Sequence, residues 1–204
     1  QPPQQTWERA KPALRTPGKR TVSVAGIATI FGQNLAPAGT ARKVETGDLL
    51  NGAVPTNLAG TCVLVGTVRA PVFAVYPTQV NFQVPWELAG RPNAQLRAVL
   101  NGVAGPPQTL TLATYSPGLF MVNSEGQGAI LDSSYRLVEP GNPVTAGSVV
   151  QIYCTGLGPV RNAAATGNPS SLTAVSQTTT PPSVSIGGLQ ATVLFSGLAP
   201  GAVG

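Results

Sequence analysis

The sequence predicts an all-β protein made of tandem immunoglobulin-like β-sandwiches, and three observations carry this prediction. Short apolar runs are interrupted throughout by breaker residues, with 24 glycines and 20 prolines among 204 residues. No long stretch keeps the 3.6-residue apolar period of an amphipathic helix. Two separated blocks also recur at nearly one offset, which indicates a duplicated unit. Because 42% of the residues are hydrophobic, the chain has enough apolar side chains to form a core.

The first half of the chain contains six candidate strands. Val63 and Val65 alternate with Cys62 and Leu64, as expected when opposite faces of one strand meet core and solvent. Asn51-Gly52 and Asn101-Gly102 are dipeptides that favour tight hairpin turns. The predicted strands are Thr21–Phe31, Thr61–Val68, Pro71–Tyr76, Gln79–Val84, Gln95–Leu100 and Gln108–Leu112.

The second half repeats this organisation. Its predicted strands are Leu119–Val122, Ala129–Leu131, Arg136–Val138, Ser148–Cys154, Ser183–Ile186 and Gln190–Phe195.

An internal repeat relates the two halves. Ile30–Leu35 aligns with Ile152–Leu157 at a shift of 122, and Val63–Ala70 aligns with Val184–Ala191 at a shift of 121. The repeat predicts one sandwich over 21–112 and a second over 113–204. The second ends before counterparts of Gln79–Val84, Gln95–Leu100 and Gln108–Leu112 appear, so we expect it to lack two or three strands. Such a unit has an unpaired edge, which either a longer chain or a strand from another chain would fill.

Residues 1–20 are expected to form an extended basic arm. This segment holds four prolines and a net charge of +4, whereas the remaining residues carry a net charge of only +1. The arm is either a solvated linker or a docking arm that packs on a neighbour with Trp7 as its anchor. Nucleic-acid binding is not expected, because the body has no basic stripe with interleaved aromatic residues.

Several motifs carry a resemblance to a known family. They are Ile30–Ala36, Pro77–Pro85, Ser116–Phe120, Thr155–Gly158, and Gly187–Ala191 followed by Gly197–Gly201. In this order they resemble the uncharacterised Solibacter-type C-terminal module of large secreted acidobacterial proteins. The resemblance covers residues 24 to 204 and implies tandem immunoglobulin-like sandwiches outside the cell, with no established enzymatic activity. The sequence departs from that family at its end, where a second version of the Gln79–Pro85 motif is expected.

The composition argues against most catalytic chemistry. With no histidine, the chain has no imidazole base, no Ser-His-Asp triad and no His-containing metal site. The seven carboxylates are scattered, and nothing in the sequence selects a catalytic pair. We therefore expect no enzyme activity, no cofactor and no metal. No apolar stretch approaches the length of a membrane-spanning helix.

Cys62 and Cys154 are the only cysteines. They fall in different predicted domains and are not equivalent in the repeat. Three alternatives are open: an inter-domain disulfide in an oxidising compartment, two buried free thiols, or a disulfide between two chains.

The sequence favours a non-enzymatic structural or assembly module of the cell exterior. Its charged residues amount to only 9%. The leading hypothesis is a filament subunit that joins copies head to tail by strand exchange. The alternative is the truncated C-terminal adhesion or glycan-binding module of a larger secreted protein, with Trp86, Tyr115 and Tyr135 as candidate sugar-stacking side chains.

Overall fold

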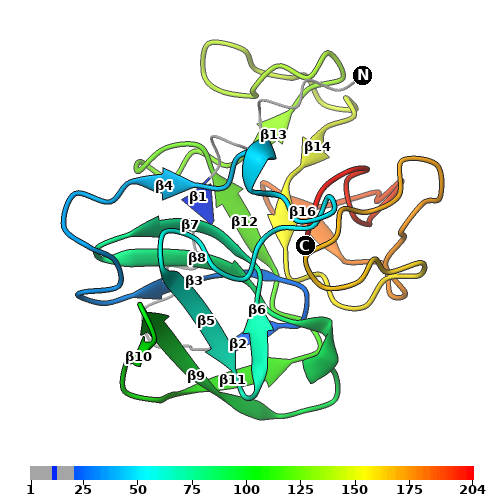
Figure 1. The fold of residues 1–204 in the computed structure, drawn as a ribbon. Helices are drawn as coiled ribbons and strands as arrows, with labels where there is room; N and C mark the ends of the chain where they lie inside the picture. Colours follow the sequence, from blue (N-terminus) through cyan, green and yellow to red (C-terminus); the bar gives the residue numbers. More distant parts are fainter. Residues whose placement is uncertain (1–10, 13–20) are drawn as a thin grey trace.

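The computed structural model describes residues 11–12 and 21–204, and its architecture there is all-β (Figure 1). The largest sheet has the order β2-β11-β9-β5-β6, with β10 paired to β9. Its strands are β2 (Thr21–Ser23), β11 (Gln108–Ala113), β9 (Asn93–Leu100), β5 (Thr61–Val65), β6 (Val68–Ala70) and β10 (Val103–Ala104). A second sheet has the order β3-β8-β7-β4. It contains β3 (Ile27–Phe31), β8 (Gln79–Gln83), β7 (Val72–Tyr76) and β4 (Arg42–Lys43).

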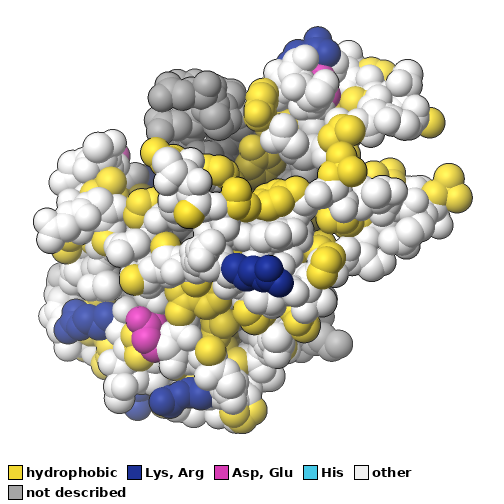
Figure 2. Space-filling view, turned by 90° about the vertical axis from the view of Figure 1, so that its right-hand side faces the viewer, with side chains coloured by type: hydrophobic (Ala, Val, Ile, Leu, Met, Phe, Trp, Pro, Cys, Tyr) yellow, Lys and Arg dark blue, Asp and Glu magenta, His cyan; other side chains and the backbone are white. Residues whose placement is uncertain are grey.

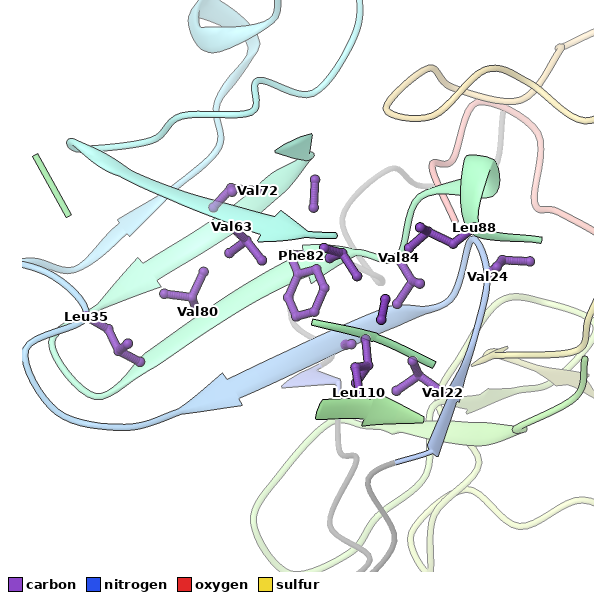
Figure 3. Close-up of a cluster of buried hydrophobic side chains, with 14 of the residues drawn as sticks. Val22, Val24, Leu35, Val63, Val72, Val80, Phe82, Val84, Leu88 and Leu110 are labelled. Carbon is purple, nitrogen blue, oxygen red and sulfur yellow. The ribbon is translucent and has the colours of Figure 1, made fainter. Parts of the chain in front are cut away.

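These two sheets face each other across one hydrophobic core, an arrangement consistent with a β-sandwich. Figure 3 shows the ring of Phe82, on β8 of the second sheet, among apolar side chains that include Val63 and Leu110 of the largest sheet. Phe82 is 1% exposed, and Val63 and Val80 are fully buried. Full burial of each such side chain stabilises the fold by about 1.5–3 kcal/mol. We refer to residues 21–112 as the first unit and to 113–204 as the second unit.

The predicted strand Thr21–Phe31 is divided into β2 and β3. Ala25 has a φ of 59°, and its N–H donates a 2.7 Å hydrogen bond to the Val84 carbonyl. β2 pairs in parallel with β11, whereas β3 pairs antiparallel with β8. The chain therefore crosses from one sheet to the other at this corner, as strands of packed sheets do at bends.

Both predicted Asn-Gly turns are confirmed. Asn101 and Gly102, between β9 and β10, have φ values of 48° and 83°; Asn51 and Gly52 have 53° and 81°. Positive φ at both central residues is the requirement of a type I′ hairpin turn. The short 3₁₀ helices η2 (Thr46–Asp48) and η3 (Trp86–Leu88) lie in other connections.

The second unit contains only short strands. Its strands are β12 (Gly118–Met121), β13 (Ile130–Leu131), β14 (Gln151–Ile152), β15 (Cys154–Thr155), β16 (Val184–Ile186) and β17 (Leu189–Ala191). β12 pairs with β15, β13 with β14, and β16 with β17.

Three predictions for the second unit are wrong in detail. The predicted strand Ser148–Cys154 is replaced by β14 and β15, which pair with different strands. Arg136–Val138 is not a strand and makes only an isolated bridge, between Leu137 and Leu131. The predicted strand Gln190–Phe195 ends at Ala191. In the observed register Val193 would face Pro182, and because proline has no N–H it cannot continue the ladder.

Within the predicted arm, β1 (Lys11–Pro12) pairs antiparallel with β12, with Lys11 opposite Met121 and Pro12 opposite Phe120. The other arm residues, the predicted anchor Trp7 among them, lie outside the described residues. The described residues form no helix with the length and apolar character that crossing a membrane requires.

Candidate functional site

The β16–β17 hairpin of the second unit reproduces the β5–β6 hairpin of the first. In β5–β6, Val63 faces Ala70 and Val65 faces Val68. In β16–β17, Val184 faces Ala191 and Ile186 faces Leu189. A shift of 121 residues converts one set of pairs into the other, and both hairpins close with a two-residue turn. The sequence repeat is thus also a repeat of strand register.

The two hairpins differ in what lies at their free edges. β5 pairs along its other edge with β9, Val63 facing Ala98 and Val65 facing Leu96. This pairing continues into the turn, where the Gly66 N–H donates a 2.7 Å hydrogen bond to the Gln95 carbonyl. Across the described part of the chain, the only strand paired with β16 is β17. The outer edge of β16 therefore presents unpaired backbone groups, which is a template for strand addition.

The hairpins also differ in burial. Val63, Val65 and Ala70 are fully buried, because the β3-β8-β7 sheet covers their face. On the equivalent face of the second unit, Val184 and Ala191 are half-buried, whereas Ile186 is 55% exposed and Leu189 is 77% exposed. Contiguous exposed apolar side chains are typical of surfaces that take part in protein, membrane or ligand binding, which makes this hairpin a candidate site.

This difference extends over both units. Within the described residues, only Ala129 and Leu131 of the buried hydrophobic side chains belong to the second unit. Conversely, most of the exposed large hydrophobic side chains do. They are Tyr115, Leu119, Tyr135, Val144, Val149, Leu172, Val175, Ile186, Leu189, Leu194 and Phe195.

The surface around the hairpin has almost no charge. Residues 162–204 contain no Asp, Glu, Lys, Arg or His. Figure 2 shows the side of the molecule on which the second unit lies. Few charged side chains are visible there, and most of the surface is polar or hydrophobic. In the first unit, by contrast, the edge strands β4 and β6 carry Arg42, Lys43 and Arg69. Charged side chains on an edge oppose pairing with another chain, and β16 and β17 have none.

A polar junction fixes the second unit against the first. The Gly167 N–H donates a 2.8 Å hydrogen bond to Oε1 of Gln83, a side chain that is 1% exposed. The Val54 N–H donates to the Gly167 carbonyl at 2.8 Å. Thr166 Oγ1 accepts from the Trp86 N–H at 3.0 Å and donates to Glu87 Oε2 at 2.7 Å. The open hairpin is therefore carried on a unit that is hydrogen-bonded to a well-packed sandwich.

The three aromatic residues considered for sugar stacking lie on different elements. Trp86 begins η3 and packs against the core of the first unit. Tyr115, in the connection after β11, is 49% exposed, and its hydroxyl forms a 2.9 Å hydrogen bond with Thr180 Oγ1. Tyr135 is 41% exposed and lies in the loop after β13. Glycan binding through these residues stays a prediction.

Both cysteines are free thiols in the structure. Cys62, on β5, is buried, and its Sγ accepts a long hydrogen bond of 3.8 Å from Arg69 Nη1. Cys154, on β15, is partly buried, and this burial raises the pKa of its thiol. A raised pKa keeps a thiol protonated and unreactive.

The carboxylate of Asp132 is held by several hydrogen bonds from the loop that follows β13. Its side chain accepts hydrogen bonds from the Arg136 and Ser134 N–H groups at 3.0 and 2.8 Å, and from Asn142 Nδ2 at 3.3 Å. The Arg136 N–H contributes most to lowering its pKa to about 2 from 3.8, against the opposing effect of burial. Asp132 Oδ2 also forms an ion pair with Arg136 Nη2 at 2.9 Å. Because its oxygens are occupied by the 132–142 loop, Asp132 acts as a structural anchor for that loop.

The described part of the chain contains no cluster of three or more His, Cys, Asp or Glu residues that could bind a metal ion. Comparisons with protein-family models, curated proteins and solved structures found no match.

The sequence indicated an unpaired edge but did not single out Ser185, Ile186 or Leu189. Two signals were available to find them: the alignment of Val184–Ala191 with a buried hairpin, and the absence of charge over 162–204. The junction through Gln83 and Gly167 gave no such signal, because it joins residues far apart in the chain.

Proposed function

We propose that the protein is a non-enzymatic structural module of the cell exterior, made of tandem immunoglobulin-like sandwiches, and that copies of it assemble through the second unit. The single observation that carries this proposal is the hairpin β16–β17. It repeats a hairpin that is buried in the first unit, yet its apolar face is open and its edge is uncharged.

Strand order in the first unit supports the immunoglobulin-like part of the proposal. In chain order, β2, β3, β5, β6, β7, β8, β9 and β11 take the places of strands A′, B, C, C′, D, E, F and G. The sheets then have the orders A′-G-F-C-C′ and B-E-D. Sandwiches of this class place F between G and C in one sheet and E beside B in the other. Strand β4 is an addition at the D edge.

The extracellular location rests on the resemblance to secreted Solibacter-type modules and on composition. A surface with few charges and many glycine, serine, threonine and proline residues suits a durable extracellular layer. The hydrogen-bonded junction between the units supports a role in spacing, because it holds the second unit in one orientation relative to the first.

Sedimentation velocity over a dilution series tests the assembly. We expect species heavier than the 20.7 kDa monomer at high concentration, which dissociate on dilution. Leu189→Lys should weaken the association, because it places like charges on the surface that both copies would bury.

Val103→Lys is the matched control, since Val103 is exposed to a similar degree, 75% against 77%, but lies on the first unit. It should leave association unchanged. A chain that stays monomeric at every concentration, or equal weakening by both variants, would overturn assembly through the second unit.

A further inference from the structure

We infer that Asn51 is a site of spontaneous deamidation, and that the isoaspartate formed there loosens the hydrogen-bonded junction between the two units. The reaction needs only water, so it does not depend on the proposed assembly. It is carried by three features: an Asn-Gly pair on an exposed turn, reacting groups that are free of hydrogen bonds, and the direct continuation of this turn into the junction.

Two asparagines in the chain precede a glycine, Asn51 and Asn101. In such a pair the backbone nitrogen of the glycine attacks the asparagine Cγ, and its approach is open because glycine carries no side chain. A C–N bond forms, the bond between Cγ and the side-chain nitrogen breaks, and the proton of the glycine nitrogen leaves with the departing ammonia. Water then opens the cyclic succinimide at either carbonyl, which gives aspartate or isoaspartate.

The turn at Asn51 leaves the reacting groups free. Asn51 and Gly52 are both exposed. Neither the Asn51 carboxamide nor the Gly52 N–H forms a hydrogen bond with any described residue. The turn is held instead by its flanking residues, because Leu50 and Ala53 exchange hydrogen bonds of 2.9 and 3.0 Å. The Asn51 carboxamide can therefore rotate towards the Gly52 nitrogen without breaking a bond.

Asn101 has the same local sequence and turn but a side chain that is held. Both asparagines lie in a Leu-Asn-Gly triplet, and their φ values are 53° and 48°. Oδ1 of Asn101, however, occupies the space beside Gly60 that a Cβ would fill. Rotation of the Asn101 carboxamide towards Gly102 would break this contact. The folded chain should thus react faster at Asn51, a difference that the local sequence alone does not predict.

The turn at Asn51 leads directly into the junction between the units. Ala53 is followed by Val54, whose N–H donates a 2.8 Å hydrogen bond to the Gly167 carbonyl. An isoaspartate lengthens the backbone by one methylene group, because the chain then runs through Cβ and Cγ. The longer loop cannot keep the geometry of both hydrogen bonds between Leu50 and Ala53. Their loss removes a constraint on the residue next to Val54.

Ageing the full-length protein in mildly alkaline buffer tests the site, because alkali deprotonates the attacking nitrogen. Trypsin releases Asn51 in the peptide 44–69 and Asn101 in the peptide 98–136, and mass spectrometry follows the replacement of NH₂ by OH in each. We expect conversion of Asn51 to be several-fold faster than that of Asn101. In urea, where neither side chain is held, the two rates should become equal.

Gly60→Ala tests the cause of the difference. Its added Cβ displaces Oδ1 of Asn101, so deamidation of Asn101 should approach the rate of Asn51. Gly39→Ala is the matched control for backbone strain, since Gly39 has a φ of +80° but open space around its Cβ position. It should leave both rates unchanged.

Hydrogen exchange tests the link to the junction. The deamidated fraction, isolated by ion-exchange chromatography, should show reduced protection of the Val54 amide. Asn51→Asp adds the same charge without lengthening the backbone, and because Asp-Gly suits this turn it should keep that protection. Equal rates at Asn51 and Asn101 in the folded chain overturn the site, as does an Asn51 that reacts only in urea. Unchanged protection of Val54 in the deamidated fraction, or an equal loss in Asn51→Asp, overturns the effect of isoaspartate on the junction.

Discussion

The hairpins β5–β6 and β16–β17 share turn length and register, but the first lies in a core and the second on the surface. Their local sequences do not explain this, because both place apolar residues at the same four positions. The difference comes from the neighbours: β9 covers the edge of β5, and the β3-β8-β7 sheet covers its face. Burial in a sandwich is thus a property of the partner strands as much as of the strand itself.

The two units consequently use different interactions for stability. The first unit has a continuous apolar core around Phe82. The second unit depends more on polar connections, with the loop around Asp132 and the junction at Gly167 as the clearest cases. Changes in the apolar interior should therefore affect the first unit strongly and the second weakly.

The largest expected effect is that of Phe82→Ala. Removing a phenylalanine that is 1% exposed leaves a cavity and should reduce the free energy of unfolding by about 3–5 kcal/mol. Phe195→Ala is the matched change in the second unit, where the ring is 52% exposed, and should cost well under half as much. Urea denaturation followed by circular dichroism measures both. Similar losses would mean that the second unit has a core comparable to that of the first.

A smaller effect is expected at the junction. Gly167 has a φ of +83°, and a Cβ there would lie 3.1 Å from Pro71 Cγ and 3.3 Å from the Val54 carbonyl oxygen. Gly167→Ala should therefore destabilise by about 1–2 kcal/mol from the left-handed backbone alone, and by more because of the contact.

Gly39→Ala is the control for that contact. Gly39 has a φ of +80° but open space around its Cβ position, so this variant carries the backbone strain without the crowding. Hydrogen exchange should show faster opening at residues 165–168 only in Gly167→Ala. Equal behaviour of the two variants would show that the junction does not couple the units.

Local chemistry explains which features were predictable. Asn51-Gly52 and Asn101-Gly102 specify their turns through the positive φ that both residues adopt. The alternation of side chains between the two faces of a strand predicted β5 and β8. The sequence repeat relates the register of the β5–β6 hairpin to that of β16–β17.

Non-local contacts explain which features were not predictable. The parallel pairing of β2 with β11 depends on a corner at Ala25. This alanine adopts a positive φ, which the sequence around it does not predict. The Gln83–Gly167 hydrogen bond joins residues 84 positions apart. For the candidate site, the repeat predicted the open edge, whereas the exposure of Ile186 and Leu189 depends on which other strands lie beside the hairpin in the folded chain.

The smallest expected effect is an acid sensitivity confined to the second unit. The pKa of Asp132 is about 2 in the folded chain and 3.8 for an unperturbed side chain, so the unfolded state binds a proton first as the pH falls. The stabilisation by Asp132 is therefore complete above about pH 4–5 and is lost progressively as the pH falls towards 2. The protection of the Ser134 and Arg136 amides, whose N–H groups bond to the carboxylate, should fall over this range while the protection of amides facing the Phe82 core does not. Protection here is the ratio of the intrinsic to the observed exchange rate, because the intrinsic rate itself varies with pH. In Asp132→Asn, the protection of these two amides should be lower at neutral pH and should stay constant between pH 4 and 2. If the first unit opens at the same pH as the 132–142 loop, the two units unfold together, and the contrast between an apolar and a polar unit does not extend to their stability.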